Sequence, residues 1–318
     1  TGPPKGAQLP HAFWTYVAEN IVNATQTTAA DTIFNCYPLN NATGQGETVV
    51  RAMVADASVA VVDGFSASSF WDQVDEYGAT ELVFWGGVLS LLLARDEEPV
   101  DRDQVRVAWG GGCTKDEWLE FEERFDIEVR QCYGTTEFMI SHQNPYDAPR
   151  PGSIGTVSEG YEARIVDEDD RPLGPGEIGE IVVRPTEPWL MFTGYYDEPD
   201  RTWADMSNLW IHSGDLGYYD EDGYFDFHER KAFSLRVKGR MVSPWQIERV
   251  LNRHPQISES TAVGVEAERG GDAIKTVVVR ENNSIAEPAI VEYCEEELPG
   301  HMVPRYVEFT DELERTHT

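Results

Sequence analysis

Two short runs of polar residues combine side chains that bind nucleotides and metal ions. Residues 133–137 (YGTTE) follow a predicted strand, and residues 210–215 (WIHSGD) precede a run rich in acidic residues. An aromatic ring can stack on a base, hydroxyls can bond phosphate oxygens, and a carboxylate can hold Mg²⁺. α/β sheets usually bind ligands at the carboxyl ends of their strands, which favours a site at 133–137 over an ordinary β-turn. Asp215 could accept hydrogen bonds from ribose hydroxyls, or it could lie in a hairpin turn. His212 has no neighbour in sequence that would orient it as a base.

Glycine-rich segments add two weaker signals. Residues 110–112 are three glycines at the end of a predicted strand, directly before Cys113. They could let a planar ligand approach the backbone closely, or they could form a tight turn. Residues 1–6 (TGPPKG) offer backbone N–H groups and Lys5 to a phosphate, although a plain solvent-exposed turn is the better explanation of this segment taken alone.

Taken together, the order and spacing of these motifs resemble the adenylate-forming superfamily, which includes acyl-CoA synthetases, peptide-synthetase adenylation domains and luciferase. Residues 1–6 match the end of its phosphate loop, 111–113 its Gly-Gly-Ala element, 133–137 its YGxTE motif and 213–215 its TGD motif. Arg230 and Gly239 match its hinge motif, and residues 304–309 (PRYVEF) match the approach to its last catalytic lysine. The resemblance covers essentially the whole chain. Within the superfamily, the sequence is most similar in character to ligases of the crotonobetaine/carnitine-CoA type.

The resemblance implies a role for each matching residue. Lys5 and Gly6 would hold the β- and γ-phosphates, Thr136 the α-phosphate and Glu137 the Mg²⁺, so that Lys5, Thr136 and Glu137 are the expected catalytic residues. Asp215 and Arg230 would hold the ribose, and Gly239 would meet the pantetheine of CoA. The remaining nucleotide contacts would come from Gly111, Gly112, Cys113, Tyr133, Gly134 and Thr135. Trp109, Phe138 and Met139 are candidate walls of the acyl pocket, with core packing as the alternative.

The implied activity is that of an acyl-CoA ligase. A carboxylic acid would react with MgATP to give an acyl-adenylate and pyrophosphate, and CoA would then displace AMP. ATP, Mg²⁺ and CoA are therefore the expected cofactors and substrates, and the acid is an unidentified small molecule. Two alternatives stay open: an adenylation domain that loads a carrier protein, and a degenerate nucleotide-binding module without catalysis.

Departures from the family pattern motivate the second alternative. Asn40-Asn41 stands where the family often has Phe-His, and Phe233 stands at the hinge position usually held by Asp or Lys. Both ends of the chain fall inside motifs, so we expect an internal fragment that lacks the N-terminal part of its large domain and the catalytic lysine. Such a fragment is expected to be inactive by itself.

The elements that must position these residues alternate between apolar runs and helical patterns, which predicts an α/β fold. Expected strands cover residues 32–36, 59–62, 82–85, 105–109 and 128–132. A capping box formed by Thr114 and Glu117 predicts a helix that presents Trp118, Phe121 and Phe125 on one face. After Pro149 the pattern becomes β-rich, with strands at 163–166 and 178–184.

The C-terminal part reads as a compact α+β unit. Ser243-Pro244 and a second capping box, Ser284 with Glu287, predict helices between strands at 260–265, 274–280 and 306–310. The sequence therefore predicts a partial large domain over residues 1–232, with mixed sheets, helices and a β-rich subdomain. A small, truncated AMP-binding domain follows over 233–318.

Charge limits the partners. Asp and Glu number 57 against 25 Lys and Arg, a net charge of −32. Such a surface repels nucleic acid and anionic lipid, and no apolar run is long enough to span a membrane. The acid-rich composition with few lysines (Lys5, Lys115, Lys231, Lys238 and Lys275) resembles proteins of salt-accumulating microbes, so we expect a halophilic protein. Four widely spaced cysteines without metal-binding spacing favour free thiols in a reducing cytoplasm.

Overall fold

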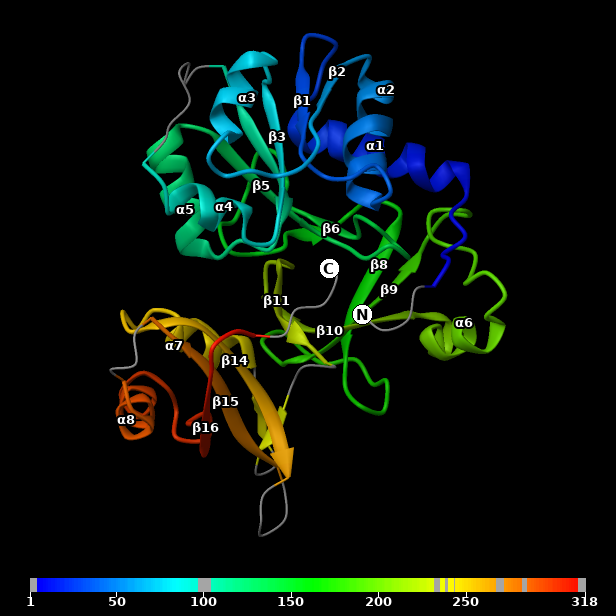
Figure 1. Ribbon diagram of the computed structural model, residues 1–318. Helices are drawn as coiled ribbons and strands as arrows, with labels where there is room; N and C mark the ends of the chain where they lie inside the picture. The colour runs from blue at the N-terminus through cyan, green and yellow to red at the C-terminus, as the bar shows by residue number, and fades with distance from the viewer. Residues whose placement is uncertain are drawn as a thin grey trace. The chain divides into compact units, whose positions relative to one another are not determined.

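The computed structural model describes residues 5–96, 104–231, 235–237, 240–242, 244–266, 272–281 and 285–313. The chain divides into two compact units, Thr1–His228 and Glu229–Thr318 (Figure 1). The expected domain boundary after residue 232 stays a prediction. Among the described residues, no helix is both long and apolar enough to cross a membrane.

The larger unit contains a seven-stranded sheet with the order β2-β1-β3-β4-β5-β6-β7. Strands β1 to β5 pair in parallel, and β6 and β7 continue the sheet in antiparallel pairs. The strands are β1 (Thr32–Asn35), β2 (Ser58–Val61), β3 (Glu81–Trp85), β4 (Val107–Gly111), β5 (Glu128–Tyr133), β6 (His142–Gln143) and β7 (Thr156–Val157). All five strands predicted in this region are present. Only β4 is displaced toward the C-terminus, because Gly110 and Gly111 continue its pairing with Phe84 and Trp85 despite their weak preference for strands.

Helices cover both faces of this sheet, so its strands are apolar on both sides. Phe34, Leu82, Phe84 and Ala108 pack with one set of helices, and Ile33 and Val83 belong to a separate cluster that includes Ala52. Trp109 packs with Phe13, Val17 and Ile21 in a third cluster. The helices of this part are α1 (His11–Thr25), η1 (Thr43–Val50, a π-helix), α2 (Arg51–Ala55), α3 (Phe70–Glu76), α4 (Val88–Leu93) and α5 (Lys115–Phe125).

Helix α5 begins as its sequence predicts. Thr114 Oγ1 accepts a hydrogen bond from Glu117 N, and the Glu117 carboxylate accepts one from Thr114 N, which completes the capping box. Trp118, Phe121 and Phe125 are all buried, as their spacing predicts. The helix therefore lies between β4 and β5 as a rigid crossover, and this places the carboxyl ends of both strands at the same edge of the sheet.

A second sheet of four strands follows, with the order β11-β10-β9-β8 (Figure 1). Strand β9 pairs antiparallel with both β8 and β10, and the pairing with β10 is interrupted by a bulge between His212 and Leu216. The elements of this region are β8 (Tyr161–Val166), β9 (Gly179–Pro185), α6 (Pro199–Asp205), η2 (Ser207–Leu209), β10 (Ile211–Tyr219) and β11 (Phe225–Arg230). The β-rich structure predicted after Pro149 is therefore confirmed.

The smaller unit is α+β. Its strands form a pair, β12-β13, and a three-stranded sheet, β14-β15-β16, in which β14 and β15 are antiparallel and β15 and β16 parallel. Buried side chains of both helices, among them Ile247 and Ile290, pack with residues of the sheet. The elements are β12 (Leu235–Val237), β13 (Arg240–Val242), α7 (Pro244–Leu251), β14 (Ile257–Glu266), β15 (Asp272–Arg280), α8 (Glu287–Glu297) and β16 (Tyr306–Thr310).

The predicted second capping box is wrong. Helix α8 begins at Glu287, with Ala286 as its N-cap and no side-chain cap. Pro288 fits this start, because proline is tolerated in the first turn of a helix, where its missing N–H leaves no intrahelical hydrogen bond unmade. Ser284 lies outside the described residues.

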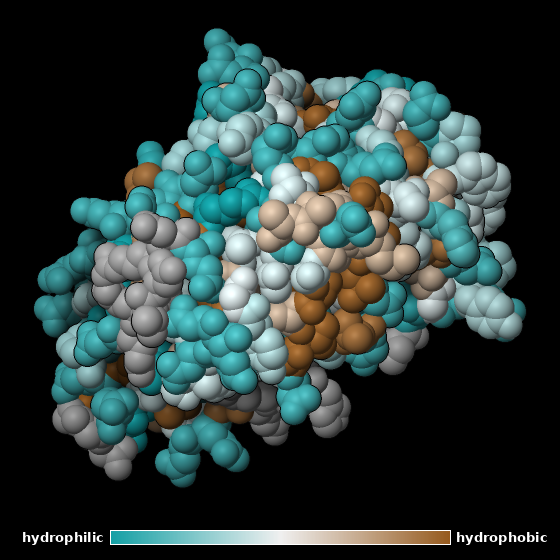
Figure 2. All heavy atoms as spheres, turned by 90° about the horizontal axis from the view of Figure 1, so that it is seen from above, coloured by the Kyte–Doolittle hydropathy of each residue, from teal (hydrophilic) through white to brown (hydrophobic). Residues whose placement is uncertain are grey.

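Hydrophilic residues predominate on the face shown in Figure 2, with a smaller hydrophobic group among them. This agrees with the acidic composition.

The four cysteines are all free and buried: Cys36, Cys113, Cys132 and Cys294.

Candidate nucleotide-binding site

The loop after β5 positions Glu137 through a turn that only glycine permits. A Cβ atom on Gly134 would lie 1.3 Å from the carbonyl oxygen of Met139, so the backbone of the loop at Gly134 packs directly against its backbone at Met139. Thr135 then accepts a hydrogen bond at Oγ1 from Glu137 N (3.2 Å), and its carbonyl accepts one from Phe138 N (3.3 Å). The YGTTE motif is thus a tightly folded loop at the carboxyl end of a strand.

Lys5 and Glu137 meet in this loop region although 132 positions separate them in sequence. The Lys5 ammonium lies 3.3 Å from Oε1 of Glu137 and 3.7 Å from Oδ2 of Asp205. Tyr195 joins all three, because its Oη accepts a hydrogen bond from Lys5 Nζ (2.6 Å) and lies 2.6 Å from Glu137 Oε1 and 3.0 Å from Asp205 Oδ2. We call these four residues the lysine cluster.

One short segment, residues 192–196, holds the lysine cluster together. Gly6 accepts a hydrogen bond at its carbonyl from Tyr196 N (2.7 Å), and Ala7 forms an antiparallel bridge with Tyr195. On the other side, Phe192 N donates to the Glu137 carbonyl (2.9 Å). The segment therefore lies between the predicted phosphate loop and the YGTTE loop, and it fixes both by backbone contacts.

Burial and hydrogen bonding set the protonation of this cluster in opposite ways. Burial acts to raise the pKa of Glu137, but the hydrogen bond from Tyr195, with Thr135 and the Lys5 ammonium, outweighs burial and holds the pKa below its ordinary value. For Tyr195, burial and the neighbouring Glu137 carboxylate both raise the pKa. Glu137 is therefore a carboxylate, and Tyr195 keeps its phenolic proton.

The donor set of the cluster fits Mg²⁺. Magnesium binds through one or two carboxylates together with substrate phosphates and keeps several waters. Glu137 is one such carboxylate, and it already faces a cation, the Lys5 ammonium. Groups of three or more His, Cys, Asp or Glu that could hold a metal by themselves are absent from the described residues. A cation held jointly by Glu137 and by phosphates suits this arrangement.

A second polar group links the end of β5 to the bulge in β10. Tyr133 Oη donates to Oδ2 of Asp215 (2.8 Å), and both side chains are buried. Asp215 N donates to Ser213 Oγ (3.0 Å), and Gly214 adopts a positive φ of 73°. Asp215 thus lies in a β-bulge within a strand and not in the hairpin turn that was its alternative; the bulge re-aims its side chain.

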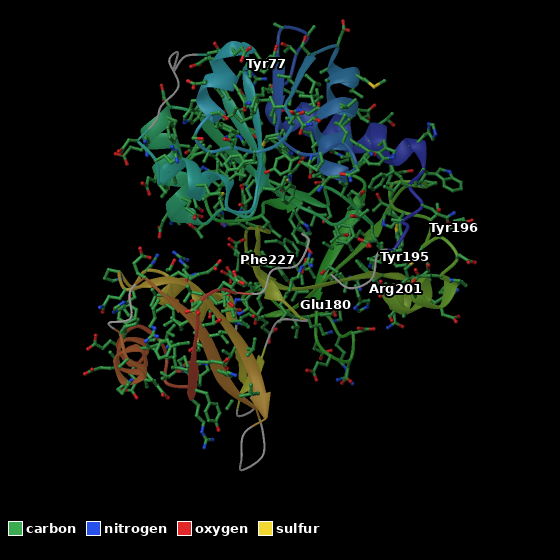
Figure 3. The ribbon with its side chains drawn as sticks, in the orientation of Figure 1. Tyr77, Glu180, Tyr195, Tyr196, Arg201 and Phe227 are labelled. Carbon is green, nitrogen blue, oxygen red and sulfur yellow. The ribbon has the colours of Figure 1, made fainter. Side chains whose placement is uncertain are left out.

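Glu180 holds the bulge from the neighbouring strand (Figure 3). Its carboxylate accepts a hydrogen bond from Gly214 N (3.0 Å) and lies 3.2 Å from Nδ1 of His212. His212 is therefore oriented by a carboxylate 32 positions away in sequence, which no local motif indicated.

Aromatic rings surround Tyr133. The ring centroids of Phe138, His142 and Phe227 lie 6.2, 5.7 and 6.4 Å from its own. His142 is fully buried, and burial lowers its pKa to about 3, so its ring is neutral. Phe227 is 45% exposed. The expectation that Tyr133 stacks on a base stays a prediction.

The glycine run has a structural explanation. A Cβ on Gly110 would lie 1.6 Å from the Phe84 carbonyl oxygen, and one on Gly111 would lie 2.8 Å from that of Cys132. Gly112 leaves the strand with a φ of 86°. Cys113 follows and donates from N (2.9 Å) and Sγ (3.0 Å) to Gln131 Oε1. Burial raises the pKa of the Cys113 thiol to about 12, so the thiol stays protonated.

Thr136 is exposed beside Glu137, and Arg230 is exposed at the end of β11. Asn41 accepts a hydrogen bond at Oδ1 from Thr43 N (2.8 Å) and so leads into η1. Trp109, Phe138 and Met139 are buried in apolar clusters, in agreement with core packing, and their role as pocket walls stays a prediction. Gly239 and Phe233 lie outside the described residues.

Sequence reasoning missed Tyr195, Asp205 and Glu180. Tyr195 and Glu180 lie on segments without a chemical motif, and each acts on a partner at least 32 positions away. The one local signal is Pro199, which begins α6 and so ends the segment that carries Tyr195.

Comparison with known proteins agrees with this geometry. Residues 1–196 match the family model described as AMP-binding enzyme, and residues 246–318 match that of the AMP-binding enzyme C-terminal domain. A crotonobetaine/carnitine-CoA ligase of Salmonella heidelberg (strain SL476) is 30% identical over 99% of this chain. The chain spans 62% of the length of that relative.

Solved structures share the fold. ATP-bound MatB from Rhodopseudomonas palustris superposes with a TM-score of 0.86 at 26% identity, covering 100% of this chain and 63% of that one. The o-succinylbenzoate-CoA synthetase MenE of Bacillus subtilis, in complex with its acyl-adenylate, gives a TM-score of 0.87 at 24% identity over 99% of this chain and 64% of that one. Lys5 and Glu137 meet in loops at the carboxyl end of a parallel sheet, and the chain matches both family models. This chain therefore belongs to the AMP-binding enzyme family.

Proposed function

We propose that the full-length protein is an acyl-CoA ligase that activates a carboxylic acid with MgATP. The observation that carries the proposal is the lysine cluster, in which an ammonium and a carboxylate from distant parts of the chain meet at the carboxyl end of β5. The similarity to a crotonobetaine/carnitine-CoA ligase supports it. We further propose that residues 1–232 belong to the larger, nucleotide-binding domain and residues 233–318 to the smaller one.

In this proposal the cluster binds the triphosphate. Lys5 and the backbone of Gly6 hold the β- and γ-phosphates, and Thr136, exposed in the loop, donates to the α-phosphate. Mg²⁺ at Glu137 would neutralise charge that develops on the phosphates. The protein carries a net charge of −32, so its overall field disfavours binding of a negatively charged acid beside a triphosphate. The local cations must therefore stabilise both anions.

The nucleoside would lie against the second polar group. Asp215, aimed by its bulge, and Arg230 would bond the ribose. Gly111, Gly112, Cys113 and Tyr133 would line the adenine, and Gly134 and Thr135 would make further contacts with the nucleotide. The acid would enter beside Trp109, Phe138 and Met139, and the pantetheine of CoA beside Gly239. These roles rest on the matching motifs, and the burial of Tyr133 and Asp215 supports a preorganised ribose contact.

The proposed reaction has two steps, adenylation and thioester formation. An oxygen of the substrate carboxylate attacks the α-phosphorus, the bond to the bridging oxygen breaks, and pyrophosphate leaves with that electron pair. The sulfur of CoA then attacks the acyl carbonyl, its thiol proton is lost, and AMP leaves with the electrons of the acyl–oxygen bond. The products are acyl-CoA, AMP and pyrophosphate.

The test is carboxylate-dependent pyrophosphate exchange by the full-length protein, followed by thioester formation. Carnitine, crotonobetaine, o-succinylbenzoate and short-chain acids, each with MgATP and labelled pyrophosphate, form the first panel. We expect exchange with at least one acid, and with CoA a thioester seen by mass spectrometry. Exchange without transfer to CoA, but with transfer to a phosphopantetheinyl carrier protein, would favour the carrier-loading alternative. MgATP binding with no exchange for any acid would favour the non-catalytic module.

A further inference from the structure

Tyr195 contacts both partners of the Lys5–Glu137 pair and is assigned no role by the matching motifs. We propose that Tyr195, supported by Asp205, is a positioning residue that sets Lys5 and Glu137 for MgATP before the nucleotide binds. The inference rests on the proposed function, because it assumes that Lys5 meets phosphates and that Glu137 meets Mg²⁺. Under this inference both groups are in position before the nucleotide binds.

The chemistry of the three groups determines the direction of each hydrogen bond. An ammonium has only donors and a carboxylate only acceptors, whereas a phenol can accept and donate at once. Tyr195 Oη therefore accepts from Lys5 Nζ and donates its single proton to Glu137 Oε1, each over 2.6 Å. Phenylalanine at this position would keep the ring and lose both bonds.

Asp205 stabilises the lysine side of this arrangement. Its Oδ2 lies 3.0 Å from Tyr195 Oη and 3.7 Å from the Lys5 ammonium. Because the phenolic proton goes to one carboxylate at a time, the shorter contact to Glu137 takes it. Asp205 then acts mainly as a second negative charge for Lys5, which keeps the ammonium over Tyr195, 4.3 Å from the ring centroid.

Tyr195 is itself held in place. Its side chain is 4% exposed and packs edge-on against Phe192, with ring centroids 5.0 Å apart. Its backbone N donates to Thr202 Oγ1 in α6 (2.9 Å), and Arg201 lies 5.7 Å from its ring centroid (Figure 3). A rotamer fixed by packing loses little further entropy on ligand binding, which is what a positioning residue requires.

This arrangement makes the exchange of cations simple. When MgATP binds, Lys5 can turn to the phosphates while the Tyr195 hydroxyl keeps its hydrogen bond to Glu137. The carboxylate thus stays oriented when its cation changes from ammonium to metal. Without the hydroxyl, Glu137 must be ordered at the time of binding, and the cost falls on the metal-dependent part of the affinity.

The test compares Tyr195→Phe with Tyr196→Phe in the full-length protein. Tyr196 is the neighbouring residue, its side chain is 70% exposed, and its contact with Gly6 is made by the backbone, so the same chemical change there leaves the cluster intact. Isothermal titration calorimetry measures ATP binding over a series of Mg²⁺ concentrations. We expect Tyr195→Phe to raise the half-saturating Mg²⁺ concentration roughly tenfold, the usual scale for a lost hydrogen bond to a charged group. ATP binding without Mg²⁺ should change less than about threefold, and Tyr196→Phe should match the wild type.

Pyrophosphate exchange provides the second measurement. A positioning role predicts that the KM for MgATP rises with Tyr195→Phe more than kcat falls. Equal Mg²⁺ dependence in the two variants, or tighter MgATP binding by Tyr195→Phe, would overturn the inference. If Tyr195→Phe does not fold, Asp205→Asn tests the lysine side instead: the KM for MgATP should rise roughly threefold, because Lys5 loses a charge that holds it in place; an unchanged KM would then overturn the inference.

The two proposals fail in different ways. A wild-type protein that binds MgATP but exchanges pyrophosphate with no acid refutes the proposed ligase, while the binding series still decides the role of Tyr195. A wild-type protein that binds no MgATP refutes both.

Discussion

Two charged clusters of the larger unit lie at opposite ends of the parallel strands. At the amino ends, Arg51 pairs with Glu81, the first residue of β3, and Arg106 bonds both Glu81 and Asp31. Asp31 directly precedes β1, and Arg106 directly precedes β4. At the carboxyl end of β5, the lysine cluster joins Lys5 and Glu137.

Both clusters pair cations with carboxylates, and the cations Arg51 and Lys5 differ in burial. The Arg51 and Glu81 side chains are both 0% exposed, and Arg51 also donates to Thr25 and Thr27. In the lysine cluster, Lys5 is 29% exposed and Asp205 36%. The first cluster joins strands and helices, and in the second the two groups that water can reach are Lys5, in a loop, and Asp205, at the end of α6.

This difference separates charges that stabilise the fold from charges that can bind a ligand. Arg51 and Glu81 cannot change partners without leaving a charge in an apolar interior, whereas the Lys5 ammonium, which is 29% exposed, can leave Glu137 for a ligand at lower cost. Parallel sheets commonly place ligand sites at the carboxyl ends of their strands.

Arg51→Met should give the largest effect, a loss of about 3–5 kcal/mol in the free energy of unfolding, because it leaves the Glu81 carboxylate buried with a charge missing from its network. Arg171→Met is the matched control: Arg171 is 73% exposed and pairs with an exposed Asp169, so it should cost at most about 1 kcal/mol. Urea unfolding of the full-length variants measures both. Similar losses in the two variants would remove the distinction between the clusters.

Glu137→Gln should affect catalysis and leave stability almost unchanged. Loss of the carboxylate charge removes the proposed metal ligand, and we expect pyrophosphate exchange to fall roughly 100-fold or more. Glu19→Gln, which changes an exposed acid on α1, should retain wild-type exchange. A loss below about threefold for Glu137→Gln, with normal melting, would assign Glu137 to structure.

Salt should act on the surface and not on the buried cluster. With a net charge of −32, repulsion among surface acids is screened at molar salt, where the Debye length is about 3 Å. We expect the Tm of the full-length protein to rise by about 5 °C or more between 0.1 and 2 M KCl. The stability deficit of Arg51→Met should be the same at both concentrations. A flat or falling Tm would contradict the expectation of a halophilic protein.

The last expected effect is a change in the pH dependence of stability. Glu47 accepts hydrogen bonds from the indole N–H groups of Trp85 and Trp109, each over 3.1 Å, and burial raises its pKa from 4.5 to about 7. The folded state therefore holds one more proton than the unfolded state between pH 4.5 and 7, so this group makes stability fall as pH rises through that window. Glu47→Gln should flatten this part of the curve.

Asp31 has the opposite sign and serves as the comparison. Despite burial, its hydrogen bonds with Arg106, Thr28 and Thr80 lower its pKa to about 2 from 3.8. Its contribution is present above pH 3.8 and is lost as pH falls through 2, below the window of Glu47. Chemical denaturation of wild type and Glu47→Gln at pH 4.5, 5.5 and 7 measures the slope. A wild-type slope retained in Glu47→Gln would show that other groups cause it.

Much of the fold could be predicted from sequence. Apolar runs placed strands β1, β2, β3 and β5 within one or two residues, and Thr114 with Glu117 placed the start of α5. The same reasoning failed for the start of α8, where Ala286, and not Ser284, is the N-cap. These features depend on neighbours a few positions apart, and their preferences are visible in the chain.

The candidate site was predictable in its parts. The YGTTE and SGD motifs gave Glu137 and Asp215, and the place of Glu137 after β5 followed from the strand pattern, whereas β10 was not among the predicted strands. Their contacts were not predictable. Tyr133 meets Asp215 across 82 positions, and Lys5 meets Tyr195 across 190.

The sequence by itself therefore determined which residue types carry charge and chemistry and which segments form strands and helices. Only the tertiary structure decided that Tyr195 bridges Lys5 and Glu137, that a bulge held by Glu180 aims Asp215, and that Arg51 is buried with Glu81. The physical reason is the range of the interactions. Backbone preference and capping act between residues close in sequence, whereas these contacts depend on how strands align and loops close across the whole unit.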